Sequence, residues 1–205
     1  LTAIVAGNRS RKALLKLACL LHDVGKPASL TRQGERICFH GHEHIGKSIT
    51  AHVARLLKLS TRERHLLCDM VEMHLRPGYL SNFKRPSSKA VFRYFRDARD
   101  EAVSIALLTI ADQRSTRGPL TTPEDIAHLE EVCGNLIERY FEMQRQEPFV
   151  PLVNGDDLIQ ILKLKPSPLF SKILKGLEEG QVTGKIQHKE QALDMARALA
   201  QRYQQ

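Results

Sequence analysis

The 205 residues suffice for one domain with an appendage or for two small lobes, and 42% hydrophobic and 26% charged residues are ordinary for a globular protein. No apolar run is long enough to cross a bilayer, and the four cysteines show no CxxC pairing, so we expect a cytoplasmic protein with free thiols. The net charge of +8 is uneven, because residues 1–120 carry 21 Lys+Arg against 10 Asp+Glu and residues 121–205 carry 10 against 13. The basic part favours a phosphate-rich partner such as a nucleotide or RNA, although a merely solvated surface would give the same count.

The apolar spacing is helical almost throughout, and period-two alternation is missing. The sequence therefore predicts an all-α fold, a helical bundle with a smaller C-terminal helical extension, and no sheet. Residues 28–41 are polar, contain glycine and are predicted to form a loop. In chain order, helices are expected at residues 13–22, at about 43–58, from Ser60 to before Pro77, from Ser87 or Ser88 onward, at about 99–113, from Pro123 onward, and near 154–163, 168–180 and 188–203.

Local sequence marks two helix starts and one boundary. Ser60-Thr61-Arg62-Glu63 has the form of a capping box, and Thr122-Pro123-Glu124-Asp125 is typical of a helix start with proline in its first turn. Residues 146–151 are interpreted as a hinge. We therefore expect a helical domain over residues 1–145 and a C-terminal helical extension over residues 151–205.

Three polar side chains are predicted to point inward. His22, His74 and Asp112 each continue a largely apolar stripe at helical spacing. Burying such groups unpaired costs about 2–7 kcal/mol even when they are neutral, and a divalent cation satisfies imidazole and carboxylate together. The alternative is a histidine that is simply hydrogen-bonded in the core, and His52 is expected at a position of that kind.

His22 differs from His52 in its context. Asp23 follows it directly, and the helix is expected to end at Gly25. Adjacent residues point about 100° apart on a helix, so both can reach one ion only near a helix end, where the glycine permits the backbone to turn.

The segment His22-Asp23-Val24-Gly25-Lys26-Pro27 resembles the HD signature of metal-dependent phosphohydrolases. Later segments, in the same order, are similar to the HD region of bacterial tRNA nucleotidyltransferase/poly(A) polymerase-type proteins. Residues 153–158 are similar to the Gly-Asp-Leu segment that opens the C-terminal, tRNA-contacting part of those proteins. The segments that carry the similarity to the HD region are Phe39-His40-Gly41-His42-Glu43, His74-Leu75-Arg76-Pro77, Leu107-Leu108-Thr109-Ile110-Ala111-Asp112 and Thr116-Arg117-Gly118-Pro119.

The resemblance implies that His22, Asp23 and Asp112 are metal ligands, and that His42 and His74 match the additional ligands of HD proteins with two metals. Such a mixed nitrogen and oxygen set suits Mn, Ni, Fe, Co, Zn or Mg and does not choose among these divalent ions. Three further histidines are expected at the surface or behind the ligands: His40, His44 and His65.

The sequence departs from the family's pattern at two places. The family's first ligand is a histidine before the HD pair, and residues 1–21 contain none. Because the chain opens with Leu1 and not with Met, we expect it to be a piece of a longer protein. Residues 166–171 also lack glycines that are usual in the related segment, which argues against close backbone contact with RNA there.

The chemistry that the resemblance implies is metal-assisted hydrolysis of a phosphate ester, with Asp23 and Lys26 as catalytic residues. Lys26, Arg76 and Arg117 each follow closely on a ligand motif, where a cation can bind a phosphoryl group. The alternative for Arg76 and Arg117 is that they only cap helix ends.

Residues 76–99 hold seven basic residues and one acid, with five aromatic residues among them: Tyr79, Phe83, Phe92, Tyr94 and Phe95. Cations beside rings can follow a nucleic-acid backbone and stack on bases. Phe92 and Phe95, however, are spaced like core residues of a helix.

Two functions remain open at this point. One is a phosphohydrolase, a phosphomonoesterase or phosphodiesterase that acts on nucleotides or RNA ends. The other is a non-catalytic RNA- or tRNA-binding body of a CCA-adding or poly(A) polymerase-type enzyme. These residues contain no Gly-Ser followed by paired aspartates and no phosphate-binding glycine loop, so a nucleotidyltransferase head is not expected within them.

Overall fold

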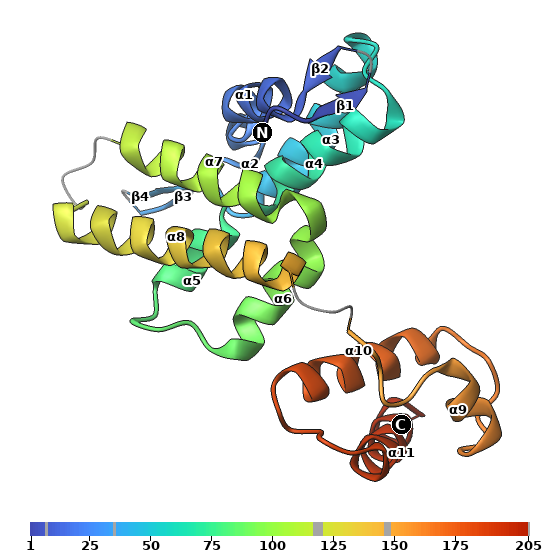
Figure 1. Ribbon diagram of the computed structural model, residues 1–205. Coiled ribbons are helices and arrows are strands. Elements are labelled where there is room, and N and C mark those ends of the chain that lie inside the picture. The colour runs from blue at the N-terminus through green and yellow to red at the C-terminus, as the bar shows by residue number, and fades with distance from the viewer. Residues whose placement is uncertain (7, 35, 117–120, 146–148, 205) are drawn as a thin grey trace. The chain divides into compact units, whose positions relative to one another are not determined.

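The computed structural model describes residues 1–6, 8–34, 36–116, 121–145 and 149–204 (Figure 1). The chain divides into two compact units. The first comprises Leu1–Pro86 and Tyr94–Arg145, and the second comprises Ser87–Arg93 and Gln146–Gln205. The second unit thus begins at the predicted hinge but also includes a short segment before it, whereas the first three hinge residues lie outside the described part.

The prediction of an all-α fold is confirmed, because most of the described residues are helical. Those before the predicted hinge form α1 (Arg11–Leu21), α2 (Lys26–Ser29), α3 (His42–Leu56), α4 (Thr61–Met73), α5 (Arg76–Ser81), α6 (Ser88–Ala98), a 3-10 turn (Arg99–Glu101), α7 (Ala102–Ser115) and α8 (Pro123–Arg145). Those after it form α9 (Gly155–Gln160), α10 (Leu169–Val182) and α11 (Lys189–Gln204). None of the described helices has both the length and the apolar character that a membrane span requires.

The expectation of no sheet is wrong at two places. Strands β1 (Ile4–Ala6) and β2 (Arg9–Ser10) form one antiparallel pair, and β3 (Thr31–Gln33) and β4 (Arg36–Cys38) form another inside the predicted loop. Strands of two or three residues are too short for an alternating pattern to show. Gly34, between β3 and β4, has a φ of 64°, a left-handed conformation that favours glycine.

The predicted helix starts are confirmed in atomic detail. The Ser60 side chain accepts a hydrogen bond from the Glu63 amide, and the Glu63 carboxylate accepts one from the Ser60 amide at 2.7 Å. The Thr122 hydroxyl accepts a hydrogen bond from the Asp125 amide at the start of α8. The short helices α2 and α5 were not predicted, because the first residue of each precedes a proline, and such a residue is disfavoured in a helix.

Each unit has an apolar core of its own. In the first unit α4 packs against α1 and α3, and α7 packs against α8. Fully buried Leu67, Met70 and Ile105 stand on these helices. The core of the second unit is built from α9, α10, α11 and the segments between them, with Leu158, Ile173 and Ala196 completely buried.

Candidate metal centre

The candidate ligands all stand at or near helix ends of the first unit. His22 is the residue after α1, Asp23 lies between α1 and α2, and His42 is the first residue of α3. His74 is the residue after α4, and Asp112 lies in the last turn of α7. The chain can therefore direct all five side chains to one place.

The five side chains form two groups that share Asp23. In the first group, His22 Nε2 lies 3.3 Å from Asp112 Oδ1 and 3.3 Å from Asp23 Oδ2. In the second, His42 Nε2 lies 3.3 Å from Asp23 Oδ1 and 3.3 Å from His74 Nε2. Within each group the potential ligand atoms are within 4.8 Å of one another. The two oxygens of Asp23 thus face different groups.

Backbone carbonyls orient the three imidazoles in the same way. Each Nδ1 lies 2.7–2.9 Å from the backbone carbonyl oxygen three residues earlier: His22 with Cys19, His42 with Phe39, and His74 with Val71. A carbonyl oxygen can only accept, so each Nδ1 carries a proton and donates it. The three Nε2 atoms therefore face the centre, and backbone carbonyls fix histidine ligands of metal sites in this way.

Charge and burial differ between the two groups. The hydrogen bonds to Asp112 and then to Asp23 raise the pKa of His22 to about 10, whereas burial lowers the pKa of His74. The pKa of Asp112 is lowered by its hydrogen bond with His22. Burial acts to raise the pKa of Asp23, but hydrogen bonds with His22 and Lys26 outweigh it and lower the value. His74 is almost fully buried, while Asp23 and Asp112 are about one third exposed. One end of the centre is thus open to solvent.

These residues fit a divalent cation. His42 Nε2 and His74 Nε2 face each other at 3.3 Å, and neither has a proton to donate if its Nδ1 is protonated and the ring is neutral. Burying two facing lone pairs beside a carboxylate is unfavourable without a positive charge between them. At His22 a proton on Nε2 can neutralise the two carboxylates, and a bound cation would take its place.

Lys26 lies at the open end of the centre. Its Nζ donates a hydrogen bond to Asp23 Oδ2 at 2.5 Å and stands 5.8 Å from the centroid of the Phe39 ring. The Lys26 side chain is 38% exposed, so the ammonium group remains accessible to a ligand in solution. It supplies a fixed positive charge beside the shared carboxylate.

Gly25 brings the helix that follows the HD pair into backbone contact with α3. Its φ of −81° and ψ of −13° are open to any residue, so the expectation that it permits an unusual turn is wrong. A Cβ at Gly25 would instead lie 2.1 Å from the His42 carbonyl oxygen and 2.7 Å from the Gly46 nitrogen. The glycine is required by close packing beside a ligand.

One of the predicted phosphate-binding residues pairs with a carboxylate outside the centre. Arg76 forms an ion pair with Asp97 at 2.9 Å, which ties α5 to α6. Arg117 lies outside the described residues. Of the two of these cations that the structure describes, Lys26 contacts a candidate ligand.

The remaining histidines named above lie at the surface. As expected, His40, His44 and His65 are exposed. The expectation for His52 is wrong, because it is exposed too. The buried stripe of α3 runs through His42, Gly46, Thr50 and Ala54 at intervals of four residues, and His52 falls between its members.

The aromatic residues of the basic stretch divide between core and surface. Phe92 and Phe95 are buried, as their spacing predicts. Tyr94 is buried as well, and its hydroxyl donates a hydrogen bond to the Ala102 carbonyl at 2.6 Å. Only Tyr79 and Phe83, 56% and 63% exposed, remain of the five for contact with a ligand.

The backbone carbonyls of Cys19, Phe39 and Val71 are the functional groups that sequence reasoning missed. Each precedes its histidine by three residues. Cys19 and Val71 lie in the last turn of the helix before their histidine, whereas Phe39 lies in the connection between β4 and α3. The sequence could have indicated these contacts only once the three histidines had been placed next to helix ends.

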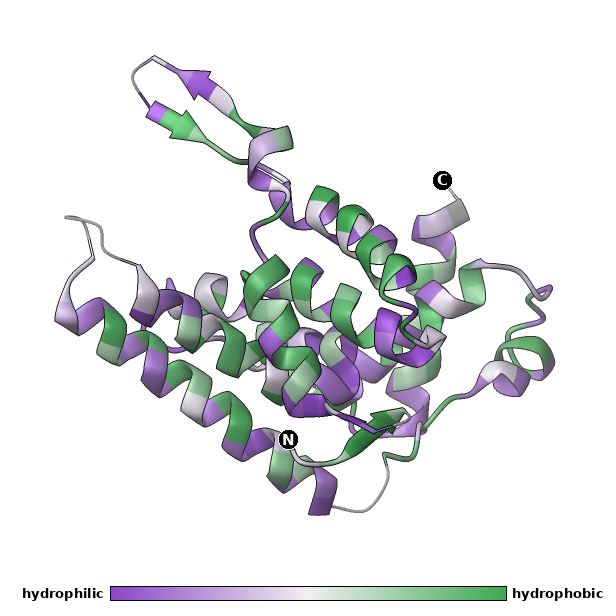
Figure 2. Ribbon diagram, turned by 90° about the horizontal axis from the view of Figure 1, so that it is seen from above, coloured by the Kyte–Doolittle hydropathy of each residue, from purple (hydrophilic) through white to green (hydrophobic). Residues whose placement is uncertain are grey.

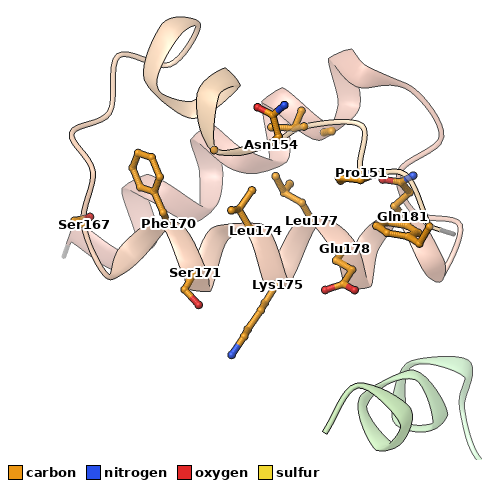
Figure 3. Close-up of a pocket in the computed structure, with 14 residues that line it drawn as sticks. Pro151, Asn154, Ser167, Phe170, Ser171, Leu174, Lys175, Leu177, Glu178 and Gln181 are labelled. Carbon is orange, nitrogen blue, oxygen red and sulfur yellow. The ribbon is translucent and has the colours of Figure 1, made fainter. Parts of the chain in front are cut away.

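The second unit contains a cavity of about 670 Å³. In Figure 3, Phe170, Leu174 and Leu177 of α10 point toward the segment that carries Asn154, and Ser171 and Lys175 of the same helix also line the cavity. The Gln181 amide accepts a hydrogen bond from the Leu152 nitrogen and donates one to the Val150 carbonyl, which fixes one border. This cavity shares no residue with the metal centre.

Comparison with known proteins agrees with the geometry of the centre. The HD domain family matches residues 1–117, and the tRNA nucleotidyltransferase domain 2 family matches residues 135–196. An A-adding tRNA nucleotidyltransferase of Deinococcus radiodurans is 29% identical over 195 residues, which are 93% of this chain and 42% of that protein. A CC-adding tRNA nucleotidyltransferase of Thermus thermophilus is 29% identical over 182 residues, 86% of this chain and 38% of that protein.

The chain thus spans about two fifths of the length of these relatives. More than half of it is matched by a single family, and that match includes the five side chains of the centre. The chain belongs to the HD domain family and is homologous over most of its length to A-adding and CC-adding tRNA nucleotidyltransferases.

Proposed function

We propose that this protein is a divalent-metal-dependent phosphohydrolase that cleaves phosphate esters of nucleotides or RNA ends. The supporting observation is that three Nε2 atoms and two carboxylates converge while the three Nδ1 atoms are tied to backbone carbonyls. A purely structural cluster has no need to direct lone pairs at one another. In this proposal residues 1–145 form the metal-binding domain and residues 151–205 form its C-terminal extension.

The proposed ligands form two sets, with Asp23 in both. His22, Asp23 and Asp112 would hold one ion, and Asp23, His42 and His74 would hold a second. When bound, a divalent ion supplies Lewis acidity toward a phosphoryl oxygen and makes water acidic enough to attack near neutral pH. The nitrogen and oxygen donors suit Mn, Ni, Fe, Co, Zn or Mg.

Lys26 and Asp23 have complementary roles in this proposal. Asp23 holds both ligand groups together through its two oxygens, and its ion pair holds the Lys26 ammonium at the open end. A positive charge there binds a substrate phosphate and stabilises the negative charge that develops on it. The exposure of Asp23 and Asp112 admits substrate from the same side.

Hydrolysis of bis-p-nitrophenyl phosphate and of 2′,3′-cyclic nucleotides, with added Mn²⁺ or Ni²⁺, tests the proposal. We expect turnover that Asp23→Ala abolishes, because both ligand groups lose a member. Glu131→Ala is the matched control, since that carboxylate is 72% exposed on α8 and belongs to neither group. Absence of turnover with every metal, or equal turnover in Asp23→Ala, would refute the phosphohydrolase proposal.

A second function is favoured by the match of residues 135–196 to tRNA nucleotidyltransferase domain 2. We propose that the chain also serves as a tRNA-binding body within a longer nucleotidyltransferase. Since the surplus of basic residues lies in residues 1–120, most phosphate contacts are expected from the first unit. Binding of tRNA should weaken steeply as salt rises. Binding that is absent, or that salt leaves unchanged, would count against it.

A further inference from the structure

The hairpin of β3 and β4 adds little to the core of its unit. Of its six strand residues only Cys38 is buried. Figure 2 shows the two strands reaching away from the helices of the same unit. An isolated two-stranded hairpin is at best marginally stable in water, so this one contributes little stability to the fold. Its surface is available for contact with another molecule.

The chain segments just before β3 and just after β4 both contact residues of the metal centre. Before β3, α2 carries Lys26, which donates a hydrogen bond to Asp23. After β4, the Phe39 carbonyl accepts the Nδ1 proton of His42 at 2.8 Å. Lys26 and Phe39 also contact each other, with Nζ 5.8 Å from the ring centroid. A ligand bound along the hairpin could therefore reach Lys26, the proposed phosphate-binding residue at the open end of the centre.

The pairing of the strands defines two faces. Arg32 lies opposite Ile37, and Gln33 lies opposite Arg36. Because side chains alternate along a strand, Arg32 and Ile37 share one face and Arg36 stands on the other. Continued by one residue at each strand end, the same alternation adds Leu30 and Phe39 to the first face. We call this set, Leu30, Arg32, Ile37 and Phe39, the outer face of the hairpin.

The outer face combines apolar and cationic groups in a definite order. At the inner end the Phe39 ring lies under Lys26, and Leu30 and Ile37, each 49% exposed, follow. Arg32 lies beside Ile37, its cross-strand partner, and is exposed. Among the described residues the side chains of Arg32 and Arg36 form no hydrogen bond or ion pair, although their backbones pair across the hairpin. An exposed apolar strip with one cation at its inner end and another beside its outer part is complementary to bases flanked by phosphates.

We propose that the outer face binds the single-stranded end of an RNA and leads its terminal phosphate ester to the metal centre. The inference rests on the proposed phosphohydrolase and names its substrate as a polynucleotide. Ile37 pairs with Arg32 and precedes Phe39 by two positions of extended chain, which corresponds to about 7 Å along the strand. Arg32 thus contacts a neighbouring nucleotide and not the one at the centre. Bases would pack on Leu30 and Ile37.

The test compares Arg32→Ala with Arg36→Ala, a matched control that removes the same charge from the opposite face of the same hairpin. Binding of a short single-stranded RNA is measured by fluorescence anisotropy over a range of salt, without added metal. For Arg32→Ala we expect about 10-fold weaker binding, and a salt dependence of log affinity that is smaller by about 0.7, the value for one phosphate contact. Arg36→Ala should bind within about 2-fold of the unchanged chain.

A second measurement separates this inference from the proposed function. Hydrolysis of bis-p-nitrophenyl phosphate should be unaffected by Arg32→Ala, whereas KM for an RNA ending in a 2′,3′-cyclic phosphate should rise about 10-fold, in line with the lost contact. Ile37→Ser should weaken RNA binding without changing its salt dependence. Equal effects of Arg32→Ala and Arg36→Ala, or none from either, would overturn the inference. If Arg32-dependent RNA binding is found but no hydrolysis, the outer face stands and the phosphohydrolase does not.

Discussion

The substitution Gly25→Ala probes how tightly the HD segment is packed on the helix that carries His42. The added Cβ would lie 2.1 Å from the His42 carbonyl oxygen and 2.7 Å from the Gly46 nitrogen. Real Cβ atoms essentially never approach another heavy atom within 3.0 Å, so the two backbone segments must separate by at least about 0.9 Å. No flexible side chain can move aside, because both contacts are with backbone.

The magnitude follows from two opposing effects. At φ −81° and ψ −13° alanine is unstrained, and Gly→Ala at such a position stabilises a protein by about 0.4–1 kcal/mol through the unfolded chain. Forcing an extra carbon into a closed contact costs about 1–3 kcal/mol or more. We therefore expect a net destabilisation of up to about 2.5 kcal/mol, the difference between the two effects. The shift of α3 also moves His42 away from Asp23, and metal affinity should fall about 10- to 100-fold.

Urea denaturation followed by circular dichroism, with Mn²⁺ titration of the folded protein, measures both effects. Gly134→Ala is the control, because a Cβ at that helical position meets nothing within 4 Å. It should stabilise the protein by about 0.5–1 kcal/mol and leave Mn²⁺ affinity unchanged. If Gly25→Ala proved as stable as Gly134→Ala and bound Mn²⁺ equally well, the proposed close packing would be refuted.

Three further predictions concern the same unit. The hydrogen bond from Arg9 lowers the pKa of buried Glu63 to about 2, so the ionised carboxylate stabilises the folded protein fully above about pH 4.5, and this contribution is lost as pH falls toward 2. The Tm of Glu63→Gln should therefore fall less steeply over this pH range than the Tm of the unchanged chain. Equal slopes of Tm against pH would contradict this prediction. Tyr94→Phe removes the hydrogen bond from the Tyr94 hydroxyl to the buried Ala102 carbonyl and should lower the free energy of unfolding by about 1–2 kcal/mol in urea denaturation. Tyr79→Phe at the surface should lower it by less than about 0.5 kcal/mol. Similar losses for the two variants would show that the hydrogen bond is unimportant. Removal of metal by EDTA should lower Tm by several degrees, because a ligand of the native state stabilises it; an unchanged Tm in protein first loaded with Mn²⁺ would contradict the site.

Much of the fold could be predicted because local signals agree with the tertiary structure. The Ser60 capping box and the Thr122 helix start are side-chain interactions within four residues, so the sequence alone determines them. The inward directions of His74 and Asp112 follow from helical spacing on stripes that are buried, whereas the stripe leading to His22 is only partly buried. These residues also meet in space, which spacing alone did not require.

Other features depend on contacts between distant segments, which a single sequence does not display. The contact of Gly25 with Gly46 depends on how α2 crosses α3, and a glycine at either place reads only as local flexibility. The exposure of His52 depends on which stripe of α3 faces α4, where two patterns were available. The sequence predicts a loop where the β3–β4 hairpin lies, because strands of three residues are too short to show an alternating pattern.

The central claim is that two carboxylates and three imidazoles form a divalent-metal centre organised around Asp23. Isothermal titration calorimetry of the metal-free protein with Mn²⁺ tests this most directly, with Asp23→Asn as a variant of equal shape and Glu131→Gln as the control. We expect saturable Mn²⁺ binding in the unchanged chain and in Glu131→Gln, and affinity at least about 100-fold weaker in Asp23→Asn, because each ligand group loses its charged oxygen. Equal Mn²⁺ binding by Asp23→Asn and the unchanged chain, or no binding by either, would contradict the account.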